Sequence, residues 1–239
     1  AYTESSNGTE FMIFGTSQSE AGMLETYVSI WDSSTLTEVS RRWLGGAEEF
    51  GFFLGQSVLT EEHLVVISSE TFIIRVLDRV TRDVLFEDAA SGSPLTEHDR
   101  AQNRVWMANN FRTEVWLLDL DTFEFRTVTG YVADSIRGLA TSPSGELVAV
   151  GSADGFVRIY TDEGELRHSI PLPNPSDAWW LDEENLVVGT GNGPWTVITL
   201  DPDRLLAAVK ASLQQGFTDA ECSLYEINPC PTLEELKGD

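Results

Sequence analysis

The chain has 239 residues, 41% hydrophobic and 23% charged, so it is long and apolar enough to bury a substantial core. Its 39 acidic and 15 basic residues give a net charge of −24, which argues against nucleic-acid binding because that binding depends on Lys and Arg displacing counterions. Anionic lipids are disfavoured for the same reason, and no apolar stretch approaches the roughly 18 residues that cross a bilayer. The charge favours solubility in a salty or extracellular setting, or a basic partner.

Short alternating segments recur along the chain at a nearly constant spacing. They are Val28–Asp32, Ile74–Asp78, Val115–Asp119, Val157–Thr161 and Val197–Asp201. Equivalent positions are about 46, 41, 42 and 40 residues apart, which is the period of four-stranded propeller blades. The spacing predicts an all-β chain, a β-propeller of about five visible four-stranded blades. Their approximate bounds are 1–43, 44–88, 89–130, 131–170 and 171–200.

The first three blades follow from runs of apolar and β-branched residues between turn signals. In the first blade we expect strands at Phe11–Phe14, Val28–Trp31 and Glu38–Arg42, with an insertion near Ser17–Glu25 that lengthens one hairpin. The second blade contains Ser57–Leu59, Leu64–Ile67, Phe72–Leu77 and Val84–Phe86. The third contains Val105–Ala108, Glu114–Leu118 and Glu124–Val128, after a weak first strand around Pro94–Thr96.

The fourth blade has the clearest pattern. Its strands are Gly138–Thr141, Leu147–Val150, Phe156–Tyr160 and Leu166–Ile170. Ser142-Pro143-Ser144-Gly145 and Ser152-Ala153-Asp154-Gly155 supply the turn residues between the first three strands. The second strand is mostly apolar, as expected where neighbouring blades cover both of its faces.

The fifth blade contains Ala178–Leu181, Leu186–Val188 and Trp195–Leu200, and then the period changes. Leu205, Leu206 and Val209 fall at helical spacing, and Thr218-Asp219-Ala220-Glu221 has the form of a capping box. Residues 201–239 are therefore expected to form a short C-terminal helical tail.

Both cysteines of the chain, Cys222 and Cys230, lie in this tail, eight positions apart. They close a disulfide if the second helix ends between them, and otherwise they are buried thiols.

The string from Ser142 to Tyr160 resembles a WD repeat, whose usual form is S-P-D-G, an apolar run, G-S-x-D-G and V-R-x-W. Val28-Ser29-Ile30-Trp31-Asp32 retains the terminal Trp-Asp. No blade has the Gly-His pair of typical WD repeats, and Trp31 is replaced by other residues in the later blades. The resemblance implies a propeller that lacks the usual buried hydrogen-bond network and relies on apolar packing instead.

The tail segments Leu205–Val209, Gly216–Cys222 and Cys230-Pro231 resemble the end of WD-repeat proteins of actinobacteria. There the propeller closes large signalling or regulatory proteins, often after a membrane-spanning helix. This resemblance implies a sensing or scaffold domain of a longer bacterial protein, on the extracellular or cell-surface side of a membrane; the cytoplasm is the alternative.

The sequence contains no pattern typical of a catalytic or metal site, and we expect no enzyme activity, metal or cofactor. His63, His98 and His168 are far apart, and there is no H-E-x-x-H, G-x-S-x-G or C-x-x-C. Gly189–Pro194 is glycine-rich but lies between two strands and lacks the Lys of a phosphate loop, so it predicts a hairpin turn.

Propellers generally bind at the face where the loops that enter the innermost strands converge. In the fourth and fifth blades the candidate residues are Asp134, Ser135, Arg137, Asp177 and Trp179. Alternation along Ala178–Leu181 sends one of the neighbouring rings of Trp179 and Trp180 between blades and the other toward the channel or surface. The alternative is that both rings pack between blades.

The leading hypothesis is a non-catalytic module that senses or binds a protein or peptide, and a basic partner is one of the two explanations of the charge. The alternative is a small-molecule or carbohydrate-binding, lectin-like propeller, which would repeat identical exposed aromatics in every blade. The ring is completed either by further blades upstream or by packing of the first blade on the fifth. An open ring would expose two blade faces and self-associate.

Overall fold

The computed structural model describes residues 2–4, 8–18, 21–46, 54–68, 71–89, 94–109, 113–129, 132, 134–191, 193–212, 215–224 and 227–237. These residues form five antiparallel sheets, in each of which the spatial order of the strands is their order in the chain. Residues 47–53, 90–93 and 130–131, at or close to three of the expected blade boundaries, lie outside the described residues.

The first two sheets each contain four strands. The first is built from β1 (Tyr2–Glu4), β2 (Glu10–Gln18), β3 (Leu24–Asp32) and β4 (Glu38–Gly46). The second is built from β5 (Leu54–Leu59), β6 (His63–Ser68), β7 (Ile73–Asp78) and β8 (Val84–Ala89). The expected insertion near Ser17–Glu25 is a continuation of the β2–β3 ladder, which pairs Ser17 with Glu25 and Gln18 with Leu24.

The remaining sheets complete the β part of the chain. The third is built from β9 (Pro94–Asp99), β10 (Arg104–Asn109), β11 (Val115–Asp119) and β12 (Phe125–Thr129). The fourth is built from β13 (Ile136–Thr141), β14 (Leu147–Ser152), β15 (Phe156–Thr161) and β16 (Leu166–Pro171). The fifth has three strands, β17 (Pro175–Trp180), β18 (Asn185–Thr190) and β19 (Thr196–Thr199).

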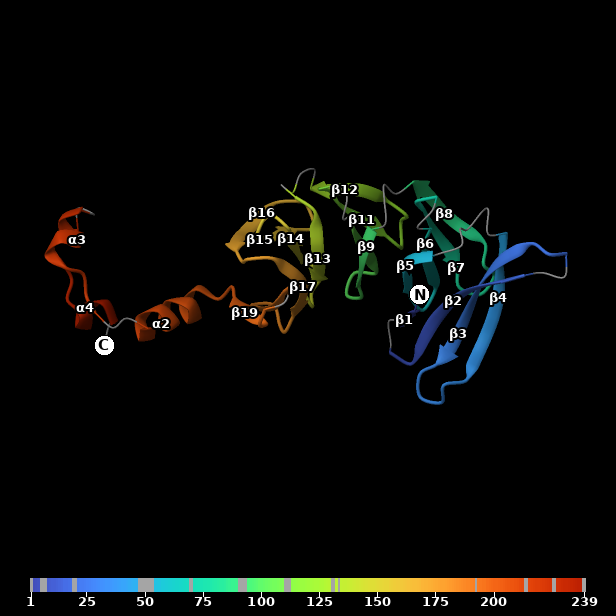
Figure 1. The fold of residues 1–239 in the computed structure, drawn as a ribbon, viewed down its shortest axis with the longest axis horizontal. Helices are drawn as coiled ribbons and strands as arrows, with labels where there is room; N and C mark the ends of the chain where they lie inside the picture. The colour runs from blue at the N-terminus through green and yellow to red at the C-terminus, as the bar shows by residue number, and fades with distance from the viewer. Residues whose placement is uncertain are drawn as a thin grey trace.

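The sheets follow one another as the blades of an open arc. The first strand of each sheet contacts the first strand of the next, in the order β1, β5, β9, β13 and β17. Figure 1 shows the first and fifth sheets at opposite ends of the row of blades. Packing of the first blade on the fifth is therefore not how the described residues are arranged, and each end of the arc has one uncovered sheet face.

A separate apolar cluster fills each interface between neighbouring sheets. Between the first and second sheets, for example, Met12 and Val28 pack with Leu59 and Leu64. The three following interfaces are filled in the same way by the clusters around Val65, Trp106 and Ala149. Neighbouring sheets cover both faces of inner strands such as β6. All six residues of β6 are therefore buried, and its sequence is mostly apolar.

At the interface of the third and fourth sheets, a buried charged network that was not expected accompanies the expected apolar packing. Arg104 and Asp99 are almost fully buried there, and Arg104 Nε and Nη2 donate to Asp99 Oδ2 at 3.1 and 2.9 Å. Arg104 Nη1 and Nη2 also donate to Asp162 Oδ2 at 2.9 Å and to the Gly145 carbonyl at 2.7 Å in the fourth sheet. A buried charged network therefore joins these two blades.

Gly145 is required at this network. A Cβ atom on residue 145 would lie 2.4 Å from Asp99 Oδ2, and the residue has a φ of +78°. Both the close approach and the left-handed backbone favour glycine. The sequence predicted a turn at Ser142–Gly145 from its turn residues, without the contact to Asp99.

The chain leaves the fifth sheet after β19 and forms a tail of three helices, α2 (Pro202–Ser212), α3 (Asp219–Leu224) and α4 (Leu233–Lys237), beyond the end of the arc (Figure 1). Asp201 Oδ1 accepts the Asp203 N–H at 2.9 Å and caps α2. The predicted capping box is present, since Thr218 N–H donates to Glu221 Oε2 at 2.8 Å and Glu221 N–H donates to Thr218 Oγ1 at 3.2 Å.

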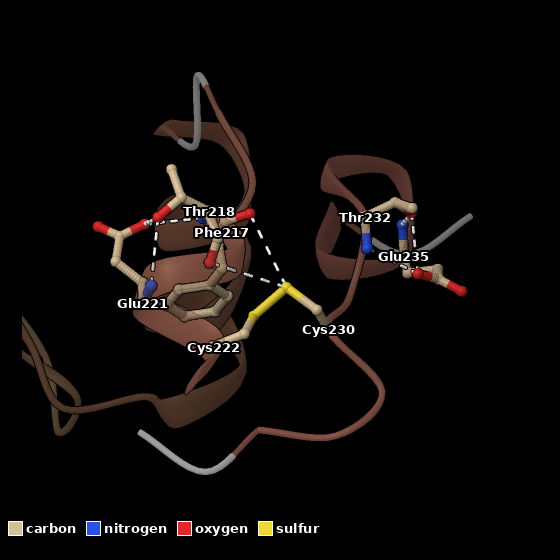
Figure 2. The surroundings of a disulfide bond; sticks show 7 residues. All are labelled: Phe217, Thr218, Glu221, Cys222, Cys230, Thr232 and Glu235. Carbon is tan, nitrogen blue, oxygen red and sulfur yellow. Dashed lines mark hydrogen bonds between the residues drawn. A yellow bond between two sulfur atoms is a disulfide. The ribbon is translucent and has the colours of Figure 1, made fainter. Parts of the chain in front are cut away.

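Cys222 on α3 and Cys230 beyond it form a disulfide, with their Cα atoms 5.6 Å apart (Figure 2). Figure 2 also shows a second capping box, in which Thr232 and Glu235 start α4. The disulfide and the caps hold the tail together over a stretch that buries little apolar surface: Cys222 is the only buried residue among the described residues of the three helices.

Candidate functional site

The five candidate residues fall into two groups. Arg137 lies in β13, and Asp177 and Trp179 lie in β17; these three line one groove on the first strands of neighbouring sheets. Asp134 and Ser135 precede β13 and do not line the groove. Their carbonyl groups accept hydrogen bonds from Ser152 Oγ at 3.0 Å and from the Ala153 N–H at 2.9 Å, so they fasten the loop to the β14–β15 hairpin.

The groove has a volume of about 180 Å³ and is built by three consecutive residues from each of three strands. Its lining residues are Leu95, Thr96 and Glu97 of β9, Arg137, Gly138 and Leu139 of β13, and Asp177, Ala178 and Trp179 of β17. The contribution of β9 was missed because this strand was expected to be weak and to end at Thr96. Its polar sequence is explained by its position, since it faces the groove.

Bulges bring Arg137 and Asp177 to the groove surface. Ile136 pairs with Ser152 and Gly138 with Gly151, which leaves Arg137 as an extra residue in β13. In β17 the register shifts in the same way between Pro175 and Ala178. A bulge redirects a side chain out of the regular alternation, and both Arg137 and Asp177 are exposed between more buried neighbours.

Gly138 allows the two bulged strands to touch. A Cβ atom on residue 138 would lie 1.8 Å from the Ser176 carbonyl oxygen, inside any van der Waals contact. The backbones of β13 and β17 are therefore in direct contact, and the groove floor at this point is main chain.

The pKa of the Glu97 carboxyl in the groove is raised. Burial raises its pKa to about 7, and the neighbouring charge of Asp99 acts in the same direction while Arg100 opposes it. Glu97 lies directly across the ladder from Trp106, whose buried Nε1 has no hydrogen-bond partner within the described part of the chain. Near neutral pH the groove therefore contains a carboxyl group that ionises readily when a cation approaches.

Two tryptophans lie beside the groove on the uncovered face of the fifth sheet. Trp179 is 53% exposed, and the centroid of its ring is 4.6 Å from that of Trp195, which is 54% exposed. Val197 is 62% exposed and aligns with Trp179 across β18. We call Trp179, Trp195 and Val197 the end face.

Trp180 points the other way. Its Nε1–H donates to the Ala140 carbonyl at 3.1 Å, and its ring packs between the fourth and fifth sheets. The neighbouring tryptophans thus divide between the blade interface and the surface, as the alternation of a strand requires.

Other functional groups are dispersed. His63, His98 and His168 lie in β6, β9 and β16, which belong to three sheets. Burial lowers the pKa of His98 to about 4. Within the described ranges, no group of three or more His, Cys, Asp or Glu is arranged to hold a metal ion. None of the described helices has the length and apolar character of a membrane span.

The five antiparallel sheets, packed face to face in chain order, define an all-β protein of the β-propeller class. The crystal structure of Hsv2 from Kluyvelomyces marxianus, a yeast β-propeller protein, matches with a TM-score of 0.61 and 15% sequence identity. The match covers 85% of this chain and 77% of the Hsv2 chain, and many other solved chains also match. At this identity the similarity shows the fold alone. No family model matches the chain, and no curated protein matches it.

Proposed function

We propose that this chain is a non-catalytic propeller module that binds a protein or peptide in the groove formed by β9, β13 and β17. One observation carries the proposal: three neighbouring inner strands each contribute three consecutive residues to a single groove, beside an exposed pair of tryptophans. Exposed aromatic residues next to a hollow are typical anchors of protein interfaces.

The chemistry of the groove favours a basic side chain of the partner. Glu97 and Asp177 supply carboxylates, and Trp179 supplies an aromatic face on which the stem or charge of a Lys or Arg packs. Arg137 donates from Nη1 to Asn174 Oδ1, which holds the guanidinium at the rim of the groove. The net charge of −24 attracts a basic partner over a longer range.

Panning a random phage-displayed peptide library on the immobilised chain tests this function. We expect enrichment of peptides with Lys or Arg next to an apolar residue, and loss of their binding to the Trp179→Ala and Asp177→Asn variants. Phe217→Ala is the matched control, because Phe217 is an aromatic residue, 42% exposed, in the helical tail and away from the groove.

Peptides that bind Trp179→Ala as well as the wild type would refute the groove as the site. If no peptide is enriched and the immobilised chain instead binds glycans, the carbohydrate-binding alternative would be favoured.

We further propose that the module belongs to a bacterial signalling protein and works outside the cytoplasm. The resemblance of the tail to actinobacterial WD-repeat proteins supports the first part. The Cys222–Cys230 disulfide supports the second, because disulfides persist in oxidising compartments. Thiol labelling of the protein taken directly from its native cells tests the location: a labelled, reduced pair would contradict it.

The open arc also supports self-association. At the opposite end from the end face, Phe11 stacks on Trp31 and Tyr27 packs on Trp43, on the side of the first sheet that faces away from the second. We propose that, when no peptide is bound, the end face of one copy packs on this aromatic surface of another, a head-to-tail contact that competes with the peptide for Trp179.

Light scattering over a wide range of concentrations measures this association. The Val197→Asp variant is expected to be monomeric, whereas Leu166→Asp, a matched change at a 52% exposed residue of an outer strand, is expected to associate like the wild type. A wild-type chain that stays monomeric at every concentration would contradict the contact.

A further inference from the structure

A second hollow lies far from the groove, between the outer strand of the first sheet and the turn that joins β7 to β8 in the second. Its volume is about 210 Å³, several times the roughly 30 Å³ that one water molecule occupies in the liquid. Three guanidinium groups line it, from Arg42 on β4 and from Arg79 and Arg82 in the turn. Only 15 residues of this strongly acidic chain are basic, so three at one small hollow is a marked concentration.

The guanidinium group of Arg82 is not satisfied by the residues that the structure describes. Its Nε and Nη1 atoms are buried, and neither has a hydrogen-bond partner among those residues. The turn fixes this arrangement: Asp78 Oδ1 accepts the Val80 and Thr81 N–H groups at 2.7 Å, and the Arg82 N–H donates to the Asp78 carbonyl at 2.9 Å. A buried donor without a partner costs free energy that a bound acceptor would recover.

The acids around the hollow leave its positive charge in excess. Glu10 lines the hollow and pairs with Arg79, which also donates from Nη1 to the Thr60 carbonyl at 3.0 Å. The Oδ1 atom of Asp78 is occupied by the turn amides. Arg42 makes no ion pair with any residue that the structure describes.

The three arginines also repel one another. Burial lowers the pKa of Arg82 below its ordinary value, and the charges of Arg42 and Arg79 lower it further, while Asp78 opposes them. Like charges held this close are a cost to the folded chain unless an anion sits between them.

We propose that this hollow binds a small oxyanion, a phosphate or carboxylate group of a soluble ligand, between Arg42 and Arg82. Guanidinium groups present planar pairs of N–H donors that match the oxygens of these anions. Ser40 Oγ lies on the same strand as Arg42 and at the same hollow, so it is placed to donate a further hydrogen bond. This site is separate from the groove and does not depend on the proposed peptide binding.

Titration of the ¹⁵N-labelled chain with inorganic phosphate, followed by amide chemical shifts at constant ionic strength, tests the proposal. We expect saturable shifts at Ser40, Arg42 and Arg82, and an affinity about tenfold lower in Arg82→Gln and Arg42→Gln, since losing a charged hydrogen bond costs about that factor. Arg41→Gln is the matched control, because Arg41 is the neighbour of Arg42 on β4 but pairs with Glu38 outside the hollow.

The arms of the titration separate the sources of the anion. Saturable shifts in the phosphate titration and none in the acetate titration identify a phosphate ligand. Saturable shifts in the acetate titration that equal those with phosphate identify a carboxylate. Shifts that match a chloride titration, or that persist undiminished in both Arg82→Gln and Arg42→Gln, would overturn the site. Arg42 is exposed on β4, so the Arg42→Gln variant is expected to fold. If Arg82→Gln does not fold, the phosphate affinity of Arg42→Gln still tests the site.

Discussion

The Glu97→Gln variant is expected to be more stable than the wild type at alkaline pH and equally stable at acidic pH. Burial raises the pKa of Glu97 from 4.5 to about 7 in the folded chain. The folded state therefore holds a proton that the unfolded state releases as the pH rises from about 4.5 to 7, and the stability of the wild type falls over that range. Glutamine fits the same site without a proton to lose.

The size of the effect follows from the shift. A difference of 2.5 units between 7 and 4.5 corresponds, at about 1.4 kcal/mol per unit, to roughly 3 kcal/mol of stability lost above pH 7. Urea unfolding of both chains at several pH values measures the difference between them, which cancels the contributions of all other titrating groups.

We expect that difference to be near zero below pH 4.5, to rise through pH 5 to 7 and to level off above. Glu163→Gln removes the same charge from an exposed turn and is the control for charge alone. Parallel stability curves for Glu97→Gln and the wild type across pH 4 to 9 would refute the burial of the Glu97 carboxyl.

Three further variants test the packing of the arc and the tail. Arg104→Met leaves Asp99 buried without its partner, and the urea midpoint should report a loss of about 3 to 5 kcal/mol, against little change for Arg167→Met in an exposed pair; equal losses would contradict the network. Gly138→Ala forces β13 and β17 apart and should cost at least about 1 to 3 kcal/mol in the same assay, so a wild-type midpoint would contradict their contact. Replacing Cys222 and Cys230 by serine should lower the local stability of the tail by about 2 to 3 kcal/mol, seen as faster amide exchange in α3 with unchanged exchange in β14; slowed or unchanged exchange in α3 would contradict this.

Strands that are covered on both faces were predictable because burial dictates their composition. Leu147–Val150 was expected from an apolar run between turn residues, and the structure extends it only to Ser152. The capping box at Thr218 and Glu221 was predictable for a similar reason, since both partners lie within one helical turn. Local chemistry fixes these elements without help from the rest of the fold.

The groove depends on features that leave little local signal. The strand β9 carries the polar residues Thr96 and Glu97 where it lines the groove, so it looks weak by composition. The bulge at Arg137 is a matter of register with β14, and nothing in the residues near Arg137 marks it.

The charged network between blades was hidden for a different reason. Arg104 bonds to Asp99 five positions away and to Asp162 in the next sheet, and only the packing of the third sheet on the fourth brings these groups together. Single positions in a sequence do not encode such contacts, although removing one partner of a buried ion pair strongly destabilises the folded chain.

The central claim is that partners bind across β9, β13 and β17. Hydrogen–deuterium exchange of the wild-type chain, with and without a peptide enriched by panning, locates the contact directly. The account predicts added protection at residues 95–97, 137–139 and 177–179, and none in the outer strands β4, β8, β12 and β16. Protection confined to those outer strands or to the helical tail would contradict it.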